Sequence, residues 1–444
     1  MTEFLADPAP TAPPPGRIAY VNARLLDPAS GLDGPGALLV EGRKIADLGP
    51  ALFADGVPEG IEAVDCAGHC LAPGLVDMHV HLREPGHEHK ETLATGSRAA
   101  AAGGVTTMAC MPNTEPTIDD IALVQFIERR ARETSIVRIH PIAAITKGLG
   151  GTELTEMGML AEAGAVAFSD DGLPVHDSLV MRRALSYATA FDALVIQHAE
   201  DPQLSGRGCM NEGETATRLG LMGIPNASEA VIVERDIRLL ELSGGRYHVA
   251  HISTAEAVDA VRHAKARGLQ VTAEAAPHHF ALNETAIGDY RTFAKVAPPL
   301  RDEASRRAIV EGLRDGTIDA IATDHAPHDQ DSKRLPFAHA ANGMVGLETL
   351  LPLALELHHN RHLGLLEVLK AMTARPAELL GLDVGRLAKG APADLVLFDL
   401  EQPWRVDADA FHSKSKNSPF DGRPVMGRVL RTVVGGRTVY LLDG

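Results

Sequence analysis

Residues 75–81 read LVDMHVH, an apolar run that ends in two histidines. Further short apolar runs follow along the chain, separated by Ala-, Leu-, Glu- and Arg-rich segments of helical period. This alternation is typical of βα units and a parallel sheet. Such units predict an α/β fold, a (β/α)8 TIM barrel, with reactive groups gathered at the carboxyl ends of its strands. The eight runs are LVDMHVH (75–81), VTTMACM (105–111), RIHPIAAI (138–145), AVAFSDD (165–171), ALVIQHAE (193–200), YHVAHIS (247–253), QVTAEAA (270–276) and IDAIATDH (318–325).

The two ends of the chain have a different pattern. Residues 17–69 and 383–444 read as short strands separated by Gly or Asp turns. Neither end has enough strands to form a covered sheet alone, so we expect them to pair into one small β-sandwich-like domain. The barrel then occupies residues 70–382. Residues 1–16 are rich in Pro and Ala, which predicts a flexible tail.

The composition excludes several classes of protein. The chain has 444 residues, of which 45% are hydrophobic, and a net charge of -17. It has no basic block interleaved with aromatic residues, so nucleic acid is not an expected partner. The N-terminus lacks the features of a secretory leader, and no apolar run is long enough to cross a bilayer, so we expect a cytoplasmic protein that does not bind membranes. Four cysteines in so long a chain do not make a disulfide framework.

His79 and His81 end the first predicted strand. Residues i and i+2 of a strand point to the same face, so both imidazoles are expected to point into the mouth of the barrel. Two neutral imidazoles that face one point are suited to a divalent metal ion. A second pair, His87 and His89, has the same spacing but is expected to lie in an exposed loop.

Four other predicted strands carry a metal-ligating side chain at or near the carboxyl end. Together with the histidine pair they make six candidate ligands. Six are too many for one tetrahedral zinc with an open position, but they suit two metal ions about 3.5–4 Å apart that share a bridging carboxylate. The four further candidates are Asp171, His198, His251 and Asp324.

Five motifs carry a resemblance that covers the chain from about residue 18 to its end: GLVDMHVHLREPG (74–86), AAGGVTTMACMPNT (101–114), AFSDDG (167–172), ATDHAPH (322–328) and GRLAKGAPADLVLFD (385–399). With these motifs the sequence closely resembles bacterial dihydroorotases of the cyclic amidohydrolase superfamily. The resemblance implies a barrel with two Zn²⁺ ions per subunit and a flanking β-domain. It also implies reversible conversion between dihydroorotate and N-carbamoyl-L-aspartate in de novo pyrimidine (UMP) biosynthesis, through a metal-bridged hydroxide.

The resemblance also implies a role for each candidate ligand: His79, His81 and Asp324 on one metal, His198 and His251 on the other, and Asp171 as the bridge. Hydantoinases, allantoinases and many other relatives have a carboxylated lysine at the bridging position. This sequence has no lysine between Lys147 and Lys265, so we expect an aspartate bridge. The spacing in relatives favours Asp171, and Asp170 stays open as the alternative.

Asp324 is the expected catalytic residue. It can take a proton from the attacking hydroxide and pass it to the amide nitrogen that leaves. A role as a metal ligand without proton transfer is the alternative. Arg83, two residues beyond the histidine pair, can bind the carboxylate of dihydroorotate through two parallel hydrogen bonds. Asn113 and His328 match substrate-binding positions of the family.

One position departs from the family. Where many relatives have Asn before a Pro-Pro pair, with the Asn touching substrate, this chain has Ala297. Residues 328–346 are polar and loop-like, and we expect either a mobile cover, whose backbone near Asn342 and Gly343 meets the substrate ring, or an ordinary surface loop.

Two other functions are compatible with the resemblance. One is a different cyclic amidase, a hydantoinase, dihydropyrimidinase or allantoinase, which Arg83 and the aspartate bridge disfavour because uncharged rings need no carboxylate clamp. The other is a non-catalytic barrel that partners aspartate transcarbamoylase, which the full set of candidate ligands disfavours. The sequence leaves open whether the chain forms a homodimer or joins such a complex.

Overall fold

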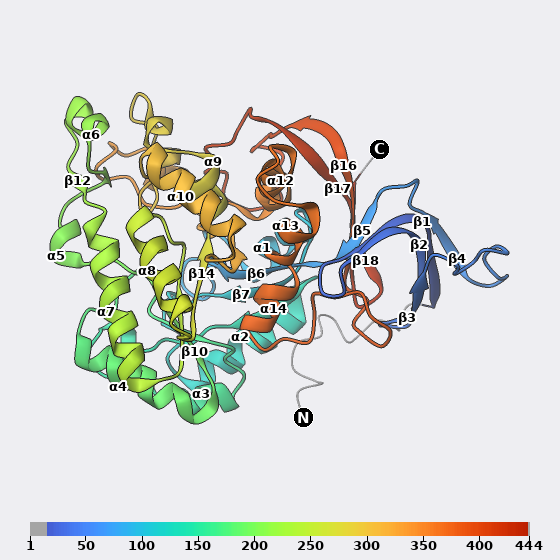
Figure 1. The fold of residues 1–444 in the computed structure, drawn as a ribbon, viewed down its shortest axis with the longest axis horizontal. Coiled ribbons are helices and arrows are strands. Elements are labelled where there is room, and N and C mark those ends of the chain that lie inside the picture. Colours follow the sequence, from blue (N-terminus) through green and yellow to red (C-terminus); the bar gives the residue numbers. More distant parts are fainter. Residues whose placement is uncertain (1–15, 443–444) are drawn as a thin grey trace.

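The computed structural model describes residues 16–442, and the tail predicted over residues 1–16 lies, except for Gly16, outside them. The larger part of the molecule consists of helices packed around a set of strands (Figure 1), and the eight strands of this part run parallel to their neighbours. Each strand lies within or overlaps one of the eight predicted runs. The strands are β6 (Leu75–Val80), β7 (Val105–Cys110), β8 (Arg138–Pro141), β9 (Phe168–Ser169), β10 (Leu194–Gln197), β13 (Arg246–Val249), β14 (Val271–Ala275) and β15 (Ala320–Ile321).

These strands are linked into a ring. Strands β6, β7 and β8 form one sheet, and β9, β10, β13, β14 and β15 form another. A parallel bridge between Ala143 and Phe168 joins the two sheets on one side. A parallel bridge between Val80 and His325 joins them on the other. The ring of eight parallel strands is a barrel, and its closure places the end of the eighth strand beside the end of the first.

The barrel strands are buried on both faces, because side chains fill the ring inside and helices cover it outside. All six residues of β6 and all six of β7 are buried, which explains their nearly unbroken apolar sequence. The α-helices within residues 16–442 are α1 (Leu93–Ala102), α2 (Ile121–Thr134), α3 (Met157–Glu162), α4 (Ser178–Ala188), α5 (Pro202–Ser205), α6 (Glu214–Leu219), α7 (Ala227–Ser243), α8 (Ala255–Ala266), α9 (Pro277–Ala281), α10 (Glu303–Arg314), α11 (Gln330–Lys333), α12 (Leu350–His359), α13 (Leu365–Lys370) and α14 (Ala374–Leu379). A short parallel pair, β11 (Met210–Asn211) and β12 (Gly223–Ile224), lies in the long connection between β10 and β13.

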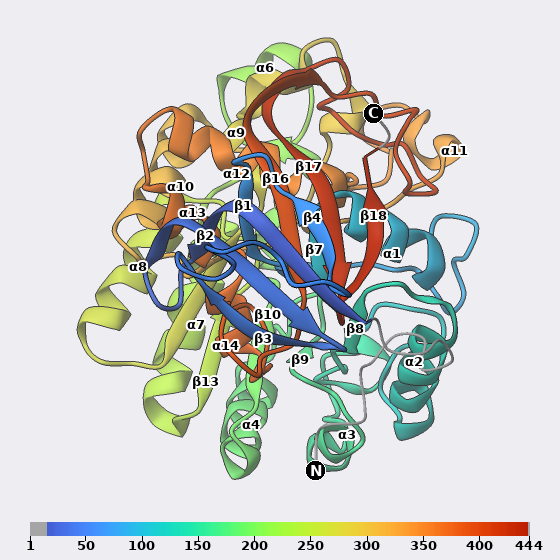
Figure 2. The same cartoon turned by 90° about the vertical axis from the view of Figure 1, so that its right-hand side faces the viewer.

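Strands from both chain ends form a second sheet beside the barrel, where Figure 2 shows the blue N-terminal strands next to the red C-terminal ones. Its order is β18-β17-β16-β5-β1-β2-β3, and β4 also pairs with β1. The join between the two ends is the antiparallel pair of β5 and β16. The strands are β1 (Arg17–Asp27), β2 (Leu32–Glu41), β3 (Lys44–Gly49), β4 (Glu62–Asp65), β5 (Cys70–Pro73), β16 (Leu395–Arg405), β17 (Pro424–Val434) and β18 (Arg437–Leu441).

This sheet is continuous, which differs from the two facing sheets of a sandwich. Strand β1 pairs with β2 along one edge, and with both β4 and β5 along the other. One strand therefore holds the N-terminal hairpin and the C-terminal strands in the same sheet. As expected, the four cysteines form no disulfide, and all are buried. Within residues 16–442, no helix has the length and apolar character needed to span a membrane.

Candidate metal centre and active site

The six candidate ligands converge at one end of the barrel. They lie on or directly after five strands, at the carboxyl ends of β6, β9, β10, β13 and β15. All six side chains are buried, and none of the residues is more than 6% exposed. Six ionisable groups shielded from water need partners, because an unpaired buried charge is costly. The six are His79, His81, Asp171, His198, His251 and Asp324.

Asp171 and the histidines of β6 form the first half of the centre. Nε2 of His79 lies 3.4 Å from Oδ1 of Asp171, and Nε2 of His81 lies 3.4 Å from Oδ2. Asp324 approaches the same two rings, with Oδ1 3.2 Å from Nε2 of His81 and 3.7 Å from Nε2 of His79. Two imidazole nitrogens and two carboxylates thus face a common point.

The second half is built from the next two strands. Oδ1 of Asp171 lies 3.4 Å from Nε2 of His251 and 3.8 Å from Nδ1 of His198. The two histidine nitrogens are 3.0 Å apart. Two ligand groups can therefore each enclose an ion, His79 with His81 and Asp171, and Asp171 with His198 and His251. Asp171 belongs to both groups, which is the position of a bridging carboxylate.

The neighbouring Asp170 points elsewhere. Its Oδ1 accepts hydrogen bonds from the backbone N–H groups of Ile145, at 2.8 Å, and Thr146, at 2.9 Å, and its other oxygen accepts one from the Thr146 hydroxyl. Adjacent residues at the end of a strand face opposite sides, so only one of the two aspartates can reach the histidines. The geometry places Asp171 there and gives Asp170 a structural role in the loop after β8.

Unpaired polar atoms at the centre fit a bound metal. Nε2 of His79 and Oδ1 of Asp171 are buried and lack a hydrogen-bond partner. Nearly all buried polar groups of folded proteins have such partners, so these two atoms are suited to bind a positively charged group. Oxygen and imidazole nitrogen donors in this number are typical of Zn²⁺ and related divalent ions. The residues present therefore fit a pair of such ions.

Each histidine of the pair His79 and His81 makes a further contact, through Nδ1, that orients its ring. Nδ1 of His79 lies 2.5 Å from Oε1 of Glu274, a buried carboxylate on β14, and Nδ1 of His81 lies 2.8 Å from Oδ1 of Asn113. In each case the Nδ1–H donates to oxygen, which leaves the lone pair on Nε2 for a metal. Asn113 also donates from Nδ2 to the backbone carbonyl of Asp171, at 3.2 Å. Asn113, predicted as a substrate-binding residue, thus also holds a ligand ring in place.

The charges of the cluster shift the pKa values of its members. Burial would lower the pKa of His79, but the carboxylates of Asp171 and Glu274 outweigh it and hold that pKa well above its ordinary value. Burial would raise the pKa of Asp171 and of Asp324, but the surrounding histidines hold both well below the ordinary value. For His198, burial and the neighbouring His251 lower the pKa to about 4. Both carboxylates are thus ionised and His198 is neutral near pH 7, as metal ligands must be, whereas His79 must release the proton on Nε2 when it binds a metal ion.

Three of the predicted site residues have a left-handed backbone. The φ angles are 62° for Arg83, 31° for His251 and 48° for Asp324. Residues other than glycine avoid this region unless the surrounding structure compensates for the strain. Of the ten non-glycine residues with positive φ among those that the structure describes, these three lie where the charged groups meet.

Arg83 lies beside His328 at the mouth of the centre. Its Nε donates to the carbonyl of Pro327 at 3.2 Å, and its Nη2 lies 3.4 Å from Nε2 of His328. Burial lowers the pKa of Arg83 to about 10, so the guanidinium stays charged at neutral pH. Burial and the charge of Arg83 lower the pKa of His328 to about 2, so its ring is neutral. Together they present a cation and a neutral imidazole.

The loop over residues 328–346 is held by the buried side chain of Lys333. Lys333 is fully buried, and its Nζ donates to the carbonyls of Ala341, Gly343 and Lys295 at 2.7, 3.0 and 3.3 Å. The N–H of Gly343 donates to the carbonyl of Lys295 at 2.9 Å, so its backbone groups have internal partners, whereas Asn342 is exposed. These contacts tie the loop to the backbone at Lys295.

Sequence reasoning missed the role of Glu274. The signal was available, because a glutamate in the middle of the buried run QVTAEAA must have a buried partner. The adjacent pair His278 and His279 is buried in α9, where Nε2 of His279 lies 3.1 Å from the carbonyl of Pro298. Ala297 is half-buried and presents no polar side chain. The pair His87 and His89 lies outside the cluster, with the His89 side chain 60% exposed.

A barrel with histidines and aspartates buried at the carboxyl ends of its strands defines the class of the protein, the amidohydrolases. Models of two families match the chain, "Dihydro-orotase-like" over residues 68–257 and "Amidohydrolase family" over residues 233–440. The dihydroorotase of Anaplasma phagocytophilum is 55% identical over 429 residues, which cover 95% of each chain. That of the Wolbachia symbiont of Brugia malayi is 52% identical over 96% of each chain. The chain belongs to the dihydroorotase family.

Solved structures of related enzymes share the fold. The L-hydantoinase (dihydropyrimidinase) of Arthrobacter aurescens superimposes with a TM-score of 0.85, at 26% identity, over 96% of this chain and 97% of that chain. A D-hydantoinase (dihydropyrimidinase) from Thermus sp. gives a TM-score of 0.81, also at 26% identity, over the same shares. The amidohydrolase barrel is therefore common to enzymes that act on different cyclic substrates. The activity of this chain has to be inferred from the residues of its site and not from the fold.

Proposed function

We propose that the chain interconverts dihydroorotate and N-carbamoyl-L-aspartate at the centre of six buried ligands. The observation that carries this proposal is the position of Arg83. Its guanidinium lies next to the neutral ring of His328 and in the field of Asp171 and Asp324, on the loop that follows the ligand pair of β6. A half-buried cation beside an amidohydrolase centre suits a substrate that carries a carboxylate.

The donor set supports two Zn²⁺ ions per subunit. We assign His79, His81 and Asp324 to one ion, His198 and His251 to the other, and Asp171 to both. When bound, such ions lower the pKa of a coordinated water toward ~7 and polarise a carbonyl oxygen. The carboxylates of Asp171 and Asp324 would balance part of the charge of the two ions, and the four neutral imidazoles would complete the ligand set.

The remaining steps belong to side chains of the chain itself. Asp324, whose pKa is held low, is ionised and can accept the proton of the attacking water. It then donates that proton to the ring amide nitrogen as the C–N bond breaks. In ring closure the order reverses, and Asp324 accepts the proton of the ureido nitrogen. Arg83, His328 and Asn113 bind and orient the substrate, with the backbone at Asn342 and Gly343 as a further proposed contact.

The division of the chain is part of the proposal. We assign the barrel to residues 70–382 and the small β-domain to residues 17–69 and 383–444. The substrate is a small molecule, and nucleic acid is not a proposed partner. A homodimer or a complex with aspartate transcarbamoylase, and a cytoplasmic location, stay predictions.

A substrate panel tests the proposal directly. Purified protein loaded with zinc is assayed with dihydroorotate, dihydrouracil, hydantoin and allantoin, and its metal content is measured. We expect about two metal ions per chain and turnover of dihydroorotate only. Removal of metal by a chelator should abolish turnover, and added Zn²⁺ should restore it. Turnover of the uncharged rings with none of dihydroorotate would instead support the hydantoinase alternative.

A further inference from the structure

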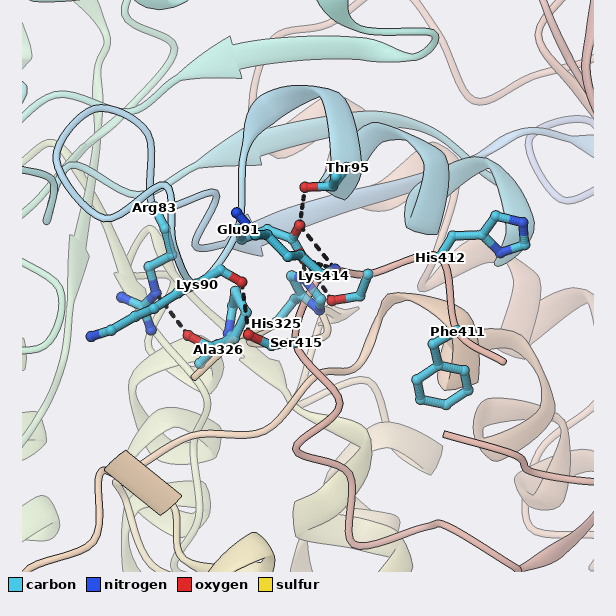
Figure 3. Close-up of polar contacts among 12 residues, drawn as sticks. Arg83, Lys90, Glu91, Thr95, His325, Ala326, Phe411, His412, Lys414 and Ser415 are labelled. Atoms are coloured by element: carbon cyan, nitrogen blue, oxygen red, sulfur yellow. Dashed lines mark hydrogen bonds and ion pairs between the residues drawn. The ribbon is translucent and has the colours of Figure 1, made fainter. Parts of the chain in front are cut away.

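A segment far along the chain crosses to the mouth of the barrel. The connection between β16 and β17 contains residues 411–417, which read FHSKSKN. Figure 3 shows Lys414 and Ser415 of this segment next to Lys90 and Glu91, which lie in the loop after β6. Arg83 belongs to that loop as well. The segment connects two strands of the small sheet, but its contacts are with loops at the candidate site.

The first part of the segment binds the loop after β6. Glu91 is fully buried, and its carboxylate accepts hydrogen bonds from the Ser413 hydroxyl, at 2.5 Å, and from the backbone N–H of Lys414, at 3.2 Å. The Ser415 hydroxyl donates to the carbonyl of Lys90 at 2.7 Å. These bonds fix the segment next to the loop that carries Arg83.

The last residue of the segment binds the loop after β15. Asn417 is 2% exposed, and its Oδ1 accepts a hydrogen bond from the backbone N–H of His328 at 3.1 Å. Its Nδ2 donates to the carbonyls of Ala326 and Gly343, both at 3.1 Å. Its own backbone carbonyl accepts from the N–H of Val345 at 3.1 Å. One side chain thereby joins both ends of the 326–345 loop.

Arg83 also contacts the 326–345 loop, through Pro327 and His328. Its Nε donates to the carbonyl of Pro327, which lies between the two residues that Asn417 holds, and its Nη2 contacts the ring of His328. The orientation of the guanidinium therefore depends on the position of the backbone at residues 326–328. The metal centre has separate supports: the backbone N–H of His81 donates to the carbonyl of His325 at 2.9 Å, and the N–H of His325 donates to the Thr323 hydroxyl at 3.0 Å.

We propose that Asn417 is a positioning residue for recognition of the substrate carboxylate. It fixes the backbone at residues 326–328 and so sets both the ring of His328 and the guanidinium of Arg83, while leaving the metal ligands in place. The inference rests on the proposed function, since it deepens the account of how that site recognises its substrate. Removal of the side chain should loosen the carboxylate site and spare the metal centre.

The test separates carboxylate recognition from the metal centre. In Asn417→Ala, we expect KM for dihydroorotate to rise about tenfold, as for loss of well-placed hydrogen bonds, with kcat changed less than about threefold. The inhibition constant of acetohydroxamic acid, which binds metal ions and has no carboxylate, should stay within about twofold of the wild-type value, and zinc content should not change. Asn417→Asp keeps the acceptor for the His328 N–H but loses the two donors, so its KM should also rise; it is measured in parallel and replaces the alanine variant if that variant does not fold.

The matched control is Asp421→Ala. Asp421 accepts a hydrogen bond from the backbone N–H of Ala408 at 3.0 Å, within the same connection, so this variant weakens the connection itself. We expect its KM to stay near the wild-type value. An unchanged KM in both Asn417 variants would overturn the proposal, as would loss of zinc, an equal rise in KM and in the hydroxamate constant, or an equal rise in KM in the control. Lack of dihydroorotate turnover by the zinc-loaded wild type would instead reject the proposed function.

Discussion

Glu274 and His79 form a buried pair that spans the barrel from β14 to β6, with Oε1 2.5 Å from Nδ1. The other carboxylate oxygen lies 3.5 Å from Nε2 of His248 on β13. Burial would raise the pKa of Glu274, but the two histidines outweigh it and lower that pKa to about 2. An ionised carboxylate on Nδ1 fixes the tautomer of His79 and makes its Nε2 a stronger ligand.

Replacement of Glu274 should therefore weaken metal binding. In Glu274→Ala, we expect the affinity for Zn²⁺ to fall roughly 10–100-fold, which is the usual effect of losing such a partner. Titration of metal-free protein with Zn²⁺ measures the change, and excess Zn²⁺ should recover part of the activity. Glu274→Gln retains an oxygen acceptor and should lose less. Equal affinity in the wild type and the alanine variant would contradict the role given to this pair.

Asp324 should be required for turnover. In Asp324→Asn the side chain still offers an oxygen to the metal, but it can no longer accept a proton, so kcat should fall about 10²–10⁴-fold. Zinc content of the purified variant, measured beside kcat, separates proton transfer from ligation. A variant that keeps both its zinc and its wild-type kcat would leave Asp324 without a catalytic role.

Arg83 should determine the preference for a charged substrate. Arg83→Lys keeps the charge but loses the planar fork, and Arg83→Met loses both. A hydrogen bond to a charged group contributes about 1.5–3 kcal/mol, so KM for dihydroorotate should rise at least about tenfold in the methionine variant and less in the lysine variant. The measurement is steady-state kinetics at fixed ionic strength. If KM is the same in all three proteins, the carboxylate is bound elsewhere.

Lys333 should make stability depend on pH. Burial and the charge of Lys295 lower the pKa of Lys333 to about 7, whereas an unfolded lysine titrates near 10.4. Between these values the unfolded chain binds more protons than the folded one, so the free energy of unfolding rises with pH, by up to about 1.4 kcal/mol per pH unit from this group. Urea unfolding of the zinc-loaded protein from pH 7 to pH 9.5 measures the slope. In Lys333→Met this part of the slope should vanish, and an identical slope in both proteins would refute the assignment.

The barrel could be predicted from the sequence because strands buried on both faces have a nearly continuous apolar sequence. A strand such as LVDMHVH is apolar along its whole length, and only its last residues face the open mouth. The alternation of side chains then places His79 and His81 on one face, and ring closure brings Asp324 beside them. The same alternation separates Asp171 from Asp170, although only the contacts of Asp170 show which one is turned away.

The parts that could not be predicted depend on contacts between distant segments. The sequence pattern of β1 shows a strand but not its neighbours, so it predicts a sandwich-like domain where the structure has one continuous sheet. The side chain of Asn417 stands in a polar segment with no periodic pattern, and its hydrogen bonds to Ala326 and His328 exist only once the fold is complete. Turn-like segments carry little information about which distant backbone they bind.

The join of β5 and β16 has a consequence for biosynthesis. Strand β5 leads through Gly74 directly into the first barrel strand, but its antiparallel partner, β16, begins only at Leu395. All the candidate metal ligands have emerged well before that partner and before Asn417. Synthesis therefore delivers every candidate metal-binding group while β5 still lacks its partner, and the small sheet can be completed only after β16 has been made.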